Sequence, residues 1–344
     1  MVDEMPAIHP LDIPPTEVDL EYADLPIIDL SLCESHEGRC TLARKIAEAL
    51  SETGFFYVVN HGTSVEEVRR MFAIADVPFS QVDDEEKALY TGDIKEGGLY
   101  RGYKARQAWH VQNGVRDQIE IYNVNRNVNL REHPLALRPY LPQISAFAHH
   151  VHENILHQIL RLLALGLELP EETFVNIHNF SAEGDSSVRF LKYYPRSEDD
   201  EVKSQSVWLK GHTDLGTLTI MYSQPIAALQ IVNAGDTLNF LSGGFYQSTI
   251  HRVIQPPIDQ RNKTRLGLLY SAMADDNVSL APFVNSPVLQ RVGVAEELKK
   301  KHHPTMAEWR SAKVTTFGQT QLVQRGDGVE EEVLLGHVVT KYYQ

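Results

Sequence analysis

The sequence predicts a mainly β fold with flanking helices, in which a helical N-terminal half packs on a β sandwich or barrel. Residues 142–167 carry an apolar stripe at helical spacing, through Ile144, Val151 and Ile159. From residue 186 onward the pattern changes to short β-rich runs separated by turn residues, which is typical of sandwiches and barrels. Hydrophobic residues make up 42% and charged residues 23% of the 344 residues, so a sizeable buried core is expected.

The N-terminal half alternates single strands with helices. The first 24 residues are acidic and rich in proline, and we expect an extended arm over the surface. The patterns that follow predict a strand in 25–31, a helix over 39–53, a strand in 54–62, a helix over 64–81 interrupted near Pro78, an irregular or hairpin-like glycine-rich segment at 92–114, and the long helix 142–167.

The C-terminal half is predicted to be mostly strands. The β-rich runs are 187–195, 206–214, 216–223, 227–232, 236–241, 247–256 and 264–275. The tail from residue 292 combines a Lys-rich helix at 294–303 with weaker elements. We therefore divide the chain into an N-terminal region, residues 1–170, and a β core with C-terminal helices, residues 171–344.

Charge and cysteine content limit the class of protein. The chain has 32 basic and 46 acidic residues and a net charge of −14, which disfavours nucleic acid as a partner but not a small anionic ligand. The two cysteines, Cys33 and Cys40, form neither a disulfide framework nor a zinc-binding spacing. No signal peptide or apolar run of membrane-spanning length is found. We expect a cytoplasmic monomer or weak homo-oligomer that acts on a small molecule and not at a membrane.

The candidate metal site combines a His-x-Asp pair with a later histidine. His212 and Asp214 are two residues apart in a strand-like run, so their side chains leave the same face. His251 lies in a second strand-like run. Two imidazoles and one carboxylate can occupy one face of an octahedron, which leaves three positions open for other ligands. This arrangement is typical of non-haem iron(II) oxygenases.

Other histidines among the 15 are weaker candidates. His149, His152 and His157 lie on the long predicted helix, where two of them could be read as a metal-binding pair. The mixed polar faces of that helix explain them better. His302 and His303 lie in the Lys-rich tail helix and are expected to be solvated.

Several motifs, in order, resemble the 2-oxoglutarate and iron(II)-dependent dioxygenase superfamily, in the branch similar to isopenicillin N synthase. They are LPIIDLS and GFFYVVNHG in the N-terminal half, then YYP at 193–195, HTDLGTLT at 212–219, NAGDTLNFLSGG at 233–244 and STIHRV at 248–253. The resemblance implies a double-stranded β-helix (jelly roll). It assigns iron(II) to His212, Asp214 and His251.

The resemblance also implies a cation for the far carboxylate of 2-oxoglutarate. Arginine binds carboxylates with two parallel hydrogen bonds. Arg265 opens an apolar strand and is preferred over Arg261, which lies in a polar loop. Gly267 stands where the family usually has a serine. Tyr194 matches the tyrosine of the family's Asn-x-Tyr motif, and Lys192, which replaces its asparagine, shares a strand face with Tyr194; both are candidates for the cosubstrate site.

A second departure concerns length. The family usually has a further strand and turn between the segments that here meet at Ile231 and Val232. Either the loop is short, or residues are missing from the sequence. We favour missing residues, because the loss of a strand would open a sheet edge.

The function implied is an oxygenase that uses iron(II), 2-oxoglutarate and O₂, with ascorbate as a possible reductant, to oxidise an unactivated C–H bond. Hydroxylation, desaturation or ring rearrangement in specialised metabolism would fit. The alternatives are an iron oxidase that uses no 2-oxoglutarate, a non-catalytic jelly-roll binding module, and a zinc hydrolase, which lacks supporting motifs. The substrate is expected between the barrel mouth and the segment from Tyr100 to Trp109, where Arg101, Lys104, Arg106 and aromatic residues cluster; an ordinary exposed basic loop explains this segment equally well.

Overall fold

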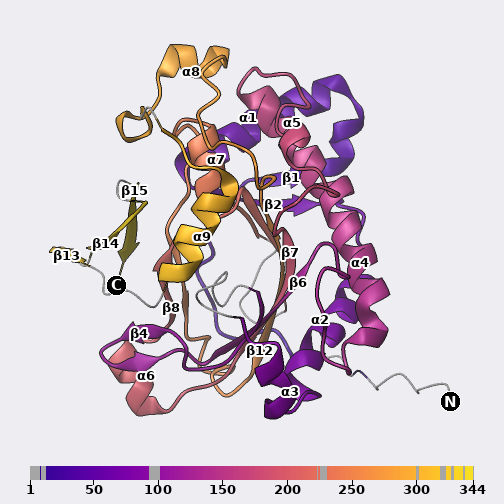
Figure 1. Ribbon diagram of the computed structural model, residues 1–344, viewed down its shortest axis with the longest axis vertical. Coiled ribbons are helices and arrows are strands. Elements are labelled where there is room, and N and C mark those ends of the chain that lie inside the picture. Colours follow the sequence, from indigo (N-terminus) through magenta and orange to yellow (C-terminus); the bar gives the residue numbers. More distant parts are fainter. Residues whose placement is uncertain are drawn as a thin grey trace.

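The computed structural model covers all 344 residues. It describes residues 8, 13–92, 101–222, 224, 231–299, 302–317, 323–326, 329–335 and 338–343. The described residues form one sheet of eight strands and one of five, with helices around the larger sheet; β13, β14 and β15 of the smaller sheet lie to one side of the molecule (Figure 1).

The larger sheet combines strands from both halves of the chain. Its order is β1-β2-β10-β9-β12-β7-β6-β3. The bounds are β1 Ile27–Asp29, β2 Phe55–Val59, β3 Gly102–Lys104, β6 Ile119–Asn125, β7 Ser187–Tyr193, β9 Leu218–Tyr222, β10 Ile231–Ala234 and β12 Arg265–Ala272. All pairings are antiparallel except β1 with β2. Because the sheet joins strands from before and after residue 170, the division of the chain at that residue stays a prediction.

The smaller sheet faces the larger one across a cavity. Its order is β11-β8-β15-β14-β13, with β8 Val207–His212, β11 His251–Ile254, β13 Val323–Gly326, β14 Val329–Leu334 and β15 Val338–Tyr343. A separate pair, β4 His110–Gln112 and β5 Val115–Arg116, lies at the lower end in Figure 1. The two facing sheets form the expected jelly roll, and side chains of both line the cavity.

Helices cover the outer face of the larger sheet. In Figure 1, α1 and α5 lie together at the upper end, and α2 and α4 run along the side of the sheet. The helical bounds are α1 His36–Glu52, α2 Val65–Ser80, α3 Asp84–Leu89, α4 Leu141–His150, α5 His157–Gly166, α6 Glu198–Ser204, α7 Asp236–Leu241, α8 Pro287–Val292 and α9 Met306–Thr316, with shorter helical turns at Leu30–Glu34, Arg138–Tyr140, Val175–Ile177 and Glu296–Leu298. The predicted long helix is therefore α4 and α5, joined by a π-helical turn at Val151–Leu156.

Three sequence-based expectations about elements are wrong. Residues 236–241 alternate like a strand but form α7, whose first turn carries Asp236 at the helix end that favours a negative charge. Helix α2 continues through Pro78 and ends two residues later, at Ser80. The Lys-rich segment at 294–303 contains only the short turn Glu296–Leu298 among its described residues, and the tail helix is α9, which begins with a Thr305–Glu308 capping box.

The expectation that residues are missing between Ile231 and Val232 stays a prediction. Ile231 and Val232 are consecutive residues of β10, which pairs with β9 on one side and β2 on the other. Among the described residues β11 pairs only with β8, so the smaller sheet ends at β11. Among the described residues, the smaller sheet therefore has an open edge at β11, of the kind that argued against a short connection.

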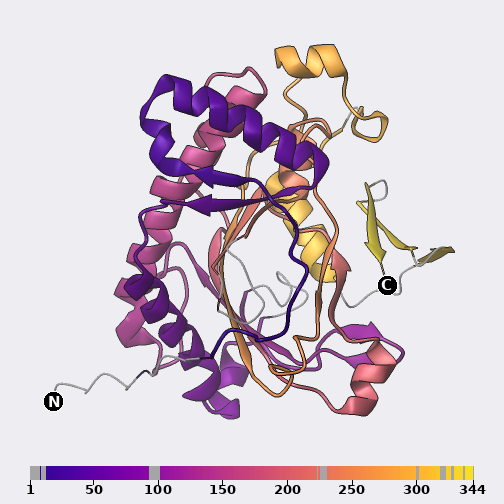
Figure 2. The ribbon, with the colours of Figure 1, turned by 180° about the vertical axis from the view of Figure 1, so that it is seen from behind.

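The N-terminal arm, residues 13–24, crosses beside this edge (Figure 2). The Thr16 hydroxyl donates to Asp259 at 2.8 Å, and the Gln260 amide donates to the carbonyl of Pro14 at 2.9 Å. Leu20 and Tyr22 of the arm line the same cavity as β11. The arm therefore supplies part of the wall on this side.

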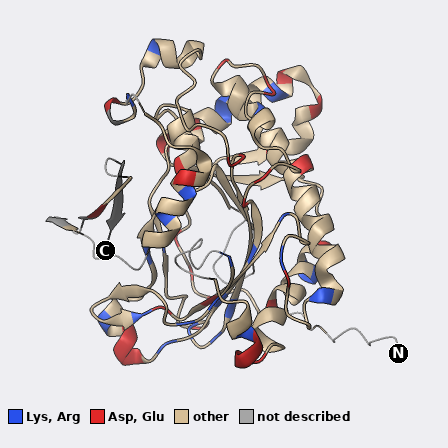
Figure 3. Ribbon diagram, viewed as in Figure 1, with Lys and Arg blue, Asp and Glu red and all other residues tan. Residues whose placement is uncertain are grey.

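Acidic residues gather at the periphery. Figure 3 shows red segments at α3 and α6, whose first turns contain acidic runs at 84–86 and 198–201. Among the described residues, no helix has both the length and the apolar character that crossing a membrane requires.

Candidate active site

The structure brings His212, Asp214 and His251 together at the cavity wall. His212 and His251 are directly opposite each other on β8 and β11. Asp214 Oδ1 lies 3.7 Å from His212 Nε2 and 3.9 Å from His251 Nε2. Two ligands of one ion at about 2.0–2.2 Å cannot be more than about 4.4 Å apart. These distances therefore fit three donors around a single metal ion.

Hydrogen bonds direct one atom of each donor toward that common point. The Nδ1 atoms of His212 and His251 contact the carbonyls of Lys210 and Thr249, at 2.8 and 3.1 Å, so the Nε2 atoms face each other and Asp214. Such bonds fix the tautomer and the ring orientation of metal-binding histidines.

The carboxylate of Asp214 is oriented in the same way. Its Oδ2 accepts hydrogen bonds from the Thr219 hydroxyl, at 2.6 Å, and from the Asn233 amide, at 2.8 Å. Oδ1 is thereby left on the side of the two imidazoles. The roles of Thr219 and Asn233 cannot be predicted from the sequence, because their contact with Asp214 depends on the pairing of β9 with β10.

A close backbone contact holds the loop that carries Asp214. A Cβ atom at Gly235 would lie 2.2 Å from the carbonyl oxygen of Gly216, so only glycine fits there. The amide of Asp236 donates to the Asp214 carbonyl at 2.7 Å, and the Asp236 carboxylate pairs with Lys313. The packing of α9 against α7 thus supports the position of Asp214.

The protonation states suit metal binding. Burial and the nearby His251 lower the pKa of His212 to about 4, so its imidazole is neutral at pH 7, as a metal ligand must be. For Asp214, burial raises the pKa, but the two histidines and the bonds from Asn233 and Thr219 outweigh it and hold the pKa below its ordinary value. The carboxylate is therefore ionised.

Arg265 lies in the same cavity, which has a volume of about 660 Å³. It begins β12 opposite Tyr193, and its guanidinium lies 5.6 Å from the centre of that ring. Among the described residues, no carboxylate lies within ion-pair distance of Arg265, and burial lowers the pKa of its guanidinium. A partly buried cation of this kind fits the far carboxylate of a dicarboxylic acid.

The expectation that Tyr194 and Lys192 face the cosubstrate is wrong. Cross-strand pairing of Tyr193 with Arg265 puts the odd-numbered residues of β7 on the cavity side, so the even-numbered ones face away. Lys192 instead forms an ion pair with Asp76 at 2.7 Å. The Tyr194 hydroxyl bonds to Glu120 on the outer face.

A side chain at position 267, where the family usually has a serine, would be crowded by Leu191. A Cβ atom at Gly267 would lie 3.2 Å from Leu191 Cδ1, so the Leu191 side chain occupies this part of the wall. Gly267 itself does not line the cavity.

The expected substrate segment is only partly at the cavity. Of this segment, Trp109 lines the cavity. Arg261, the second candidate for the cosubstrate cation, also lines the cavity, at an exposed position. Arg106 instead stacks on Tyr194 at 4.6 Å, and Lys104 forms a buried ion pair with Asp117. Tyr100 lies outside the described residues.

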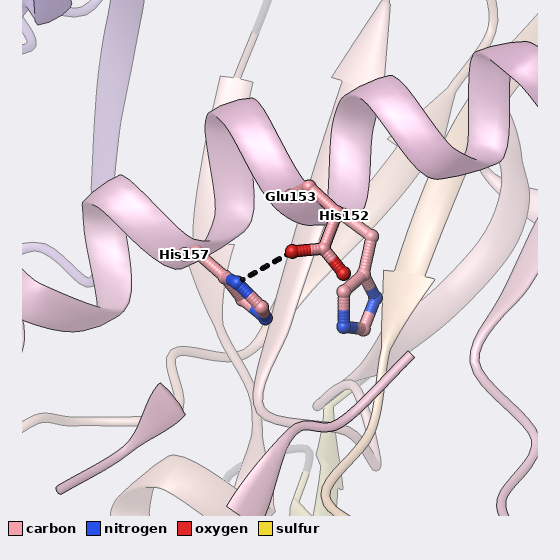
Figure 4. Close-up of side chains that lie close together, drawn as sticks. All are labelled: His152, Glu153 and His157. Carbon is pink, nitrogen blue, oxygen red and sulfur yellow. Dashed lines mark ion pairs between the residues drawn. The ribbon is translucent and has the colours of Figure 1, made fainter. Parts of the chain in front are cut away.

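A second group with metal-binding residue types lies on the π-helical turn. The wide turn brings His152, Glu153 and His157 together (Figure 4). Both ring nitrogens of His152 are engaged, one with the Tyr270 hydroxyl and one with the carbonyl of His178, each at 2.8 Å. Because a metal would have to displace these bonds, the group is better explained as a packed polar network.

Two family models match consecutive parts of the chain. Residues 25–143 match the non-haem dioxygenase in morphine synthesis N-terminal family, and residues 186–270 match the 2OG-Fe(II) oxygenase superfamily. The chain belongs to the 2-oxoglutarate and iron(II)-dependent oxygenase superfamily. It is an Fe(II)/2-oxoglutarate-dependent dioxygenase, with iron(II) and 2-oxoglutarate as cofactors.

Individual relatives of this dioxygenase agree with that assignment. It is 27% identical over 262 residues to a flavonol synthase/flavanone 3-hydroxylase of Matthiola incana, covering 70% of this chain and 83% of that one. It is 26% identical over 286 residues to the 2-oxoglutarate-dependent dioxygenase frbH of Dothideomycetidae sp. (strain 11243), covering 76% and 85%. A full-length Neurospora crassa protein, whose crystal structure was solved in complex with alpha-KG, shares the fold, with a TM-score of 0.71 at 20% identity over 85% of this chain and 96% of that one.

Proposed function

We propose that this dioxygenase oxidises an unactivated C–H bond of a small molecule of specialised metabolism, with iron(II) held by His212, Asp214 and His251. Arg265 would pair with the far carboxylate of 2-oxoglutarate. The observation that supports this most strongly is the convergence of three oriented donor atoms on one side of a cavity that also contains a guanidinium without a carboxylate partner among the described residues. When bound, iron(II), 2-oxoglutarate and O₂ supply the oxidation of the C–H bond, with release of succinate and CO₂.

The side chains of the enzyme would position the reactants and exclude water. Thr219 and Asn233 hold the carboxylate of Asp214, and the two backbone carbonyls hold the imidazoles. Arg265 and Tyr193 would orient the cosubstrate at the far end of the cavity. The apolar wall, which includes Trp109 and Phe317, would keep the reaction away from bulk water.

The curated relatives support a small-molecule substrate. They include a flavonol synthase/flavanone 3-hydroxylase, a scopoletin 8-hydroxylase and leucoanthocyanidin dioxygenases. A cavity of about 660 Å³ lies within the range of small-molecule sites, about 300–1,000 Å³.

Formation of succinate from 2-oxoglutarate tests this proposal. The wild-type enzyme, loaded with iron(II) and incubated with candidate small molecules, should form succinate, whereas His212→Ala should form none. His302→Ala, which removes an exposed histidine, is the matched control and should behave as wild type. Iron-dependent succinate formation that persists in His212→Ala would contradict the assignment. Substrate oxidation without succinate would indicate an oxidase that uses no 2-oxoglutarate.

A further inference from the structure

The entrance of the cavity can be located from the exposure of the residues that line it. The exposed side chains among its described lining residues are Glu21, Tyr22, Arg252, Ile254 and Arg261. All of them belong either to the N-terminal arm or to β11 and the loop that follows it. The entrance therefore lies between the arm on one side and β11 with its loop on the other.

The arm is an addition to the part of the chain that the family pattern describes. Its residues, 13–24, precede residues 25–143, which match the N-terminal family model. Leu20 and Tyr22 nevertheless line the same cavity as His212 and Asp214. The arm thus adds a wall to the cavity for which the family match does not account.

Both ends of the arm are held by the body of the protein. Ile13, at its start, is buried, and at its other end the chain enters β1, which pairs with β2. Residues 14–24, between these two points, are all exposed or half-buried. The middle of the arm can therefore leave the surface while both of its ends stay in place.

The carboxylate of Asp259 holds the arm at the entrance. It accepts hydrogen bonds from the Thr16 hydroxyl, at 2.8 Å, and from the Glu17 amide, at 2.8 Å. These bonds, with that from Glu17 the stronger cause, keep the pKa of Asp259 below its ordinary value, so the carboxylate is ionised at pH 7. Both bonds are exposed to solvent, and a segment held mainly by exposed hydrogen bonds opens at a low cost in free energy.

The arm presents apolar surface at the entrance. The Tyr22 side chain is 56% exposed and Leu20 is half-buried, and Ile254 on the opposite side is 55% exposed. A ligand that extends from the metal site to the entrance would cover part of these side chains, and burial of apolar surface is favourable. Binding of such a ligand would therefore favour the arm in the position that Asp259 holds.

We propose that the arm is a movable part of the substrate site, which opens to admit the substrate and then closes on it. Leu20 and Tyr22 would contact a hydrophobic part of the bound substrate, and Asp259 would act as a positioning residue that slows its release. The proposal rests on the proposed function, because it takes this cavity as the substrate site. It makes Leu20 and Tyr22 determinants of substrate affinity and not of cosubstrate binding.

Binding of N-phenyl-1-naphthylamine to the anaerobic iron(II) enzyme, saturated with 2-oxoglutarate, tests the contact with Leu20 and Tyr22. This uncharged aromatic probe becomes fluorescent in apolar surroundings, and the wild-type enzyme should bind one equivalent. The double variant Leu20→Ser/Tyr22→Ser should raise the Kd of the probe about fivefold or more, because apolar contact is lost. Leu135→Ser, which changes an exposed apolar residue outside the lining of the cavity, is the matched control and should keep the wild-type Kd.

Stopped-flow measurement of probe release tests the role of Asp259. Asp259→Ala removes the acceptor of both bonds from the arm and should raise the dissociation rate about fivefold or more, since changes in affinity appear mainly in the rate of release. Asp199→Ala, which removes an exposed carboxylate of α6 that does not line the cavity, should release the probe at the wild-type rate.

The possible failures are distinguishable, because the affinity for 2-oxoglutarate is measured separately by calorimetry. A wild-type enzyme that binds 2-oxoglutarate but not the probe, a wild-type Kd in the double variant, or a wild-type release rate in Asp259→Ala would overturn the inference about the arm alone. Loss of 2-oxoglutarate binding in the double variant would also overturn it, since these residues would then support the cosubstrate site. A wild-type enzyme that binds no 2-oxoglutarate would contradict the proposed function and this inference together.

Discussion

Replacement of Arg265 by glutamine should weaken the binding of 2-oxoglutarate without unfolding the protein. Loss of one partner of a buried charge pair costs about 2–5 kcal/mol. Arg265 is only partly buried and lies against the Tyr193 ring at 5.6 Å, so the lower part of this range applies. We expect a loss of about 2–3 kcal/mol, and therefore a rise in the Kd of about 30- to 150-fold.

The measurement is calorimetric titration of the anaerobic iron(II) enzyme with 2-oxoglutarate. Arg261→Gln is the matched control, because Arg261 lines the cavity at an exposed position. Exposed charges contribute at most about 1 kcal/mol, so its Kd should change less than about fivefold. An unchanged Kd in Arg265→Gln, or a larger effect of Arg261→Gln, would refute the assignment of the cosubstrate site.

Three further changes test the surroundings of the site. Asn233→Ala removes a hydrogen bond to Asp214 and should lower iron(II) affinity about 10- to 100-fold in competition with a chelator; an unchanged affinity would show that this bond does not support the site. Burial lowers the pKa of His178 to about 4, so below pH 6.5 the unfolded chain takes up a proton that the folded protein does not. The free energy of unfolding, from urea denaturation of the metal-free protein, should therefore fall by up to about 1.4 kcal/mol per pH unit for this group between pH 6.5 and 4, and a flat profile there would contradict this. Gly267→Ser crowds the Leu191 side chain and should destabilise the protein by about 1–3 kcal/mol, with partial recovery in a double variant that also carries Leu191→Ala. If Gly267→Ser is as stable as wild type, the Leu191 side chain can move to make room for the serine, and the prediction is wrong.

The parts of the site that could be predicted are those that depend on short spacing along the chain. His212 and Asp214 are two residues apart, and His251 lies in a nearby strand run that pairs directly with β8. The sequence pattern predicts that Arg265 opens an apolar strand, and β12 does begin at Arg265. Local pattern was sufficient in these cases.

Features that depend on pairing between distant segments could not be predicted. The pairing of Tyr193 with Arg265 determines which face of β7 lines the cavity. The sequence does not show this pairing, and an assignment shifted by one residue puts Lys192 and Tyr194 on the cavity side instead. The bonds from Thr219 and Asn233 to Asp214 likewise need the β9–β10 pairing. The segment of α7 alternates like a strand, and the alternation alone does not distinguish it from a helix that begins at Asp236.

Anaerobic titration of the metal-free protein with iron(II) is the most direct test of the metal site. We expect the wild-type protein to bind one equivalent, and Asp214→Ala to bind none at the same concentrations, because the carboxylate is the only anionic donor of the three. One equivalent bound by Asp214→Ala with wild-type affinity, or none by the wild type, would contradict the account.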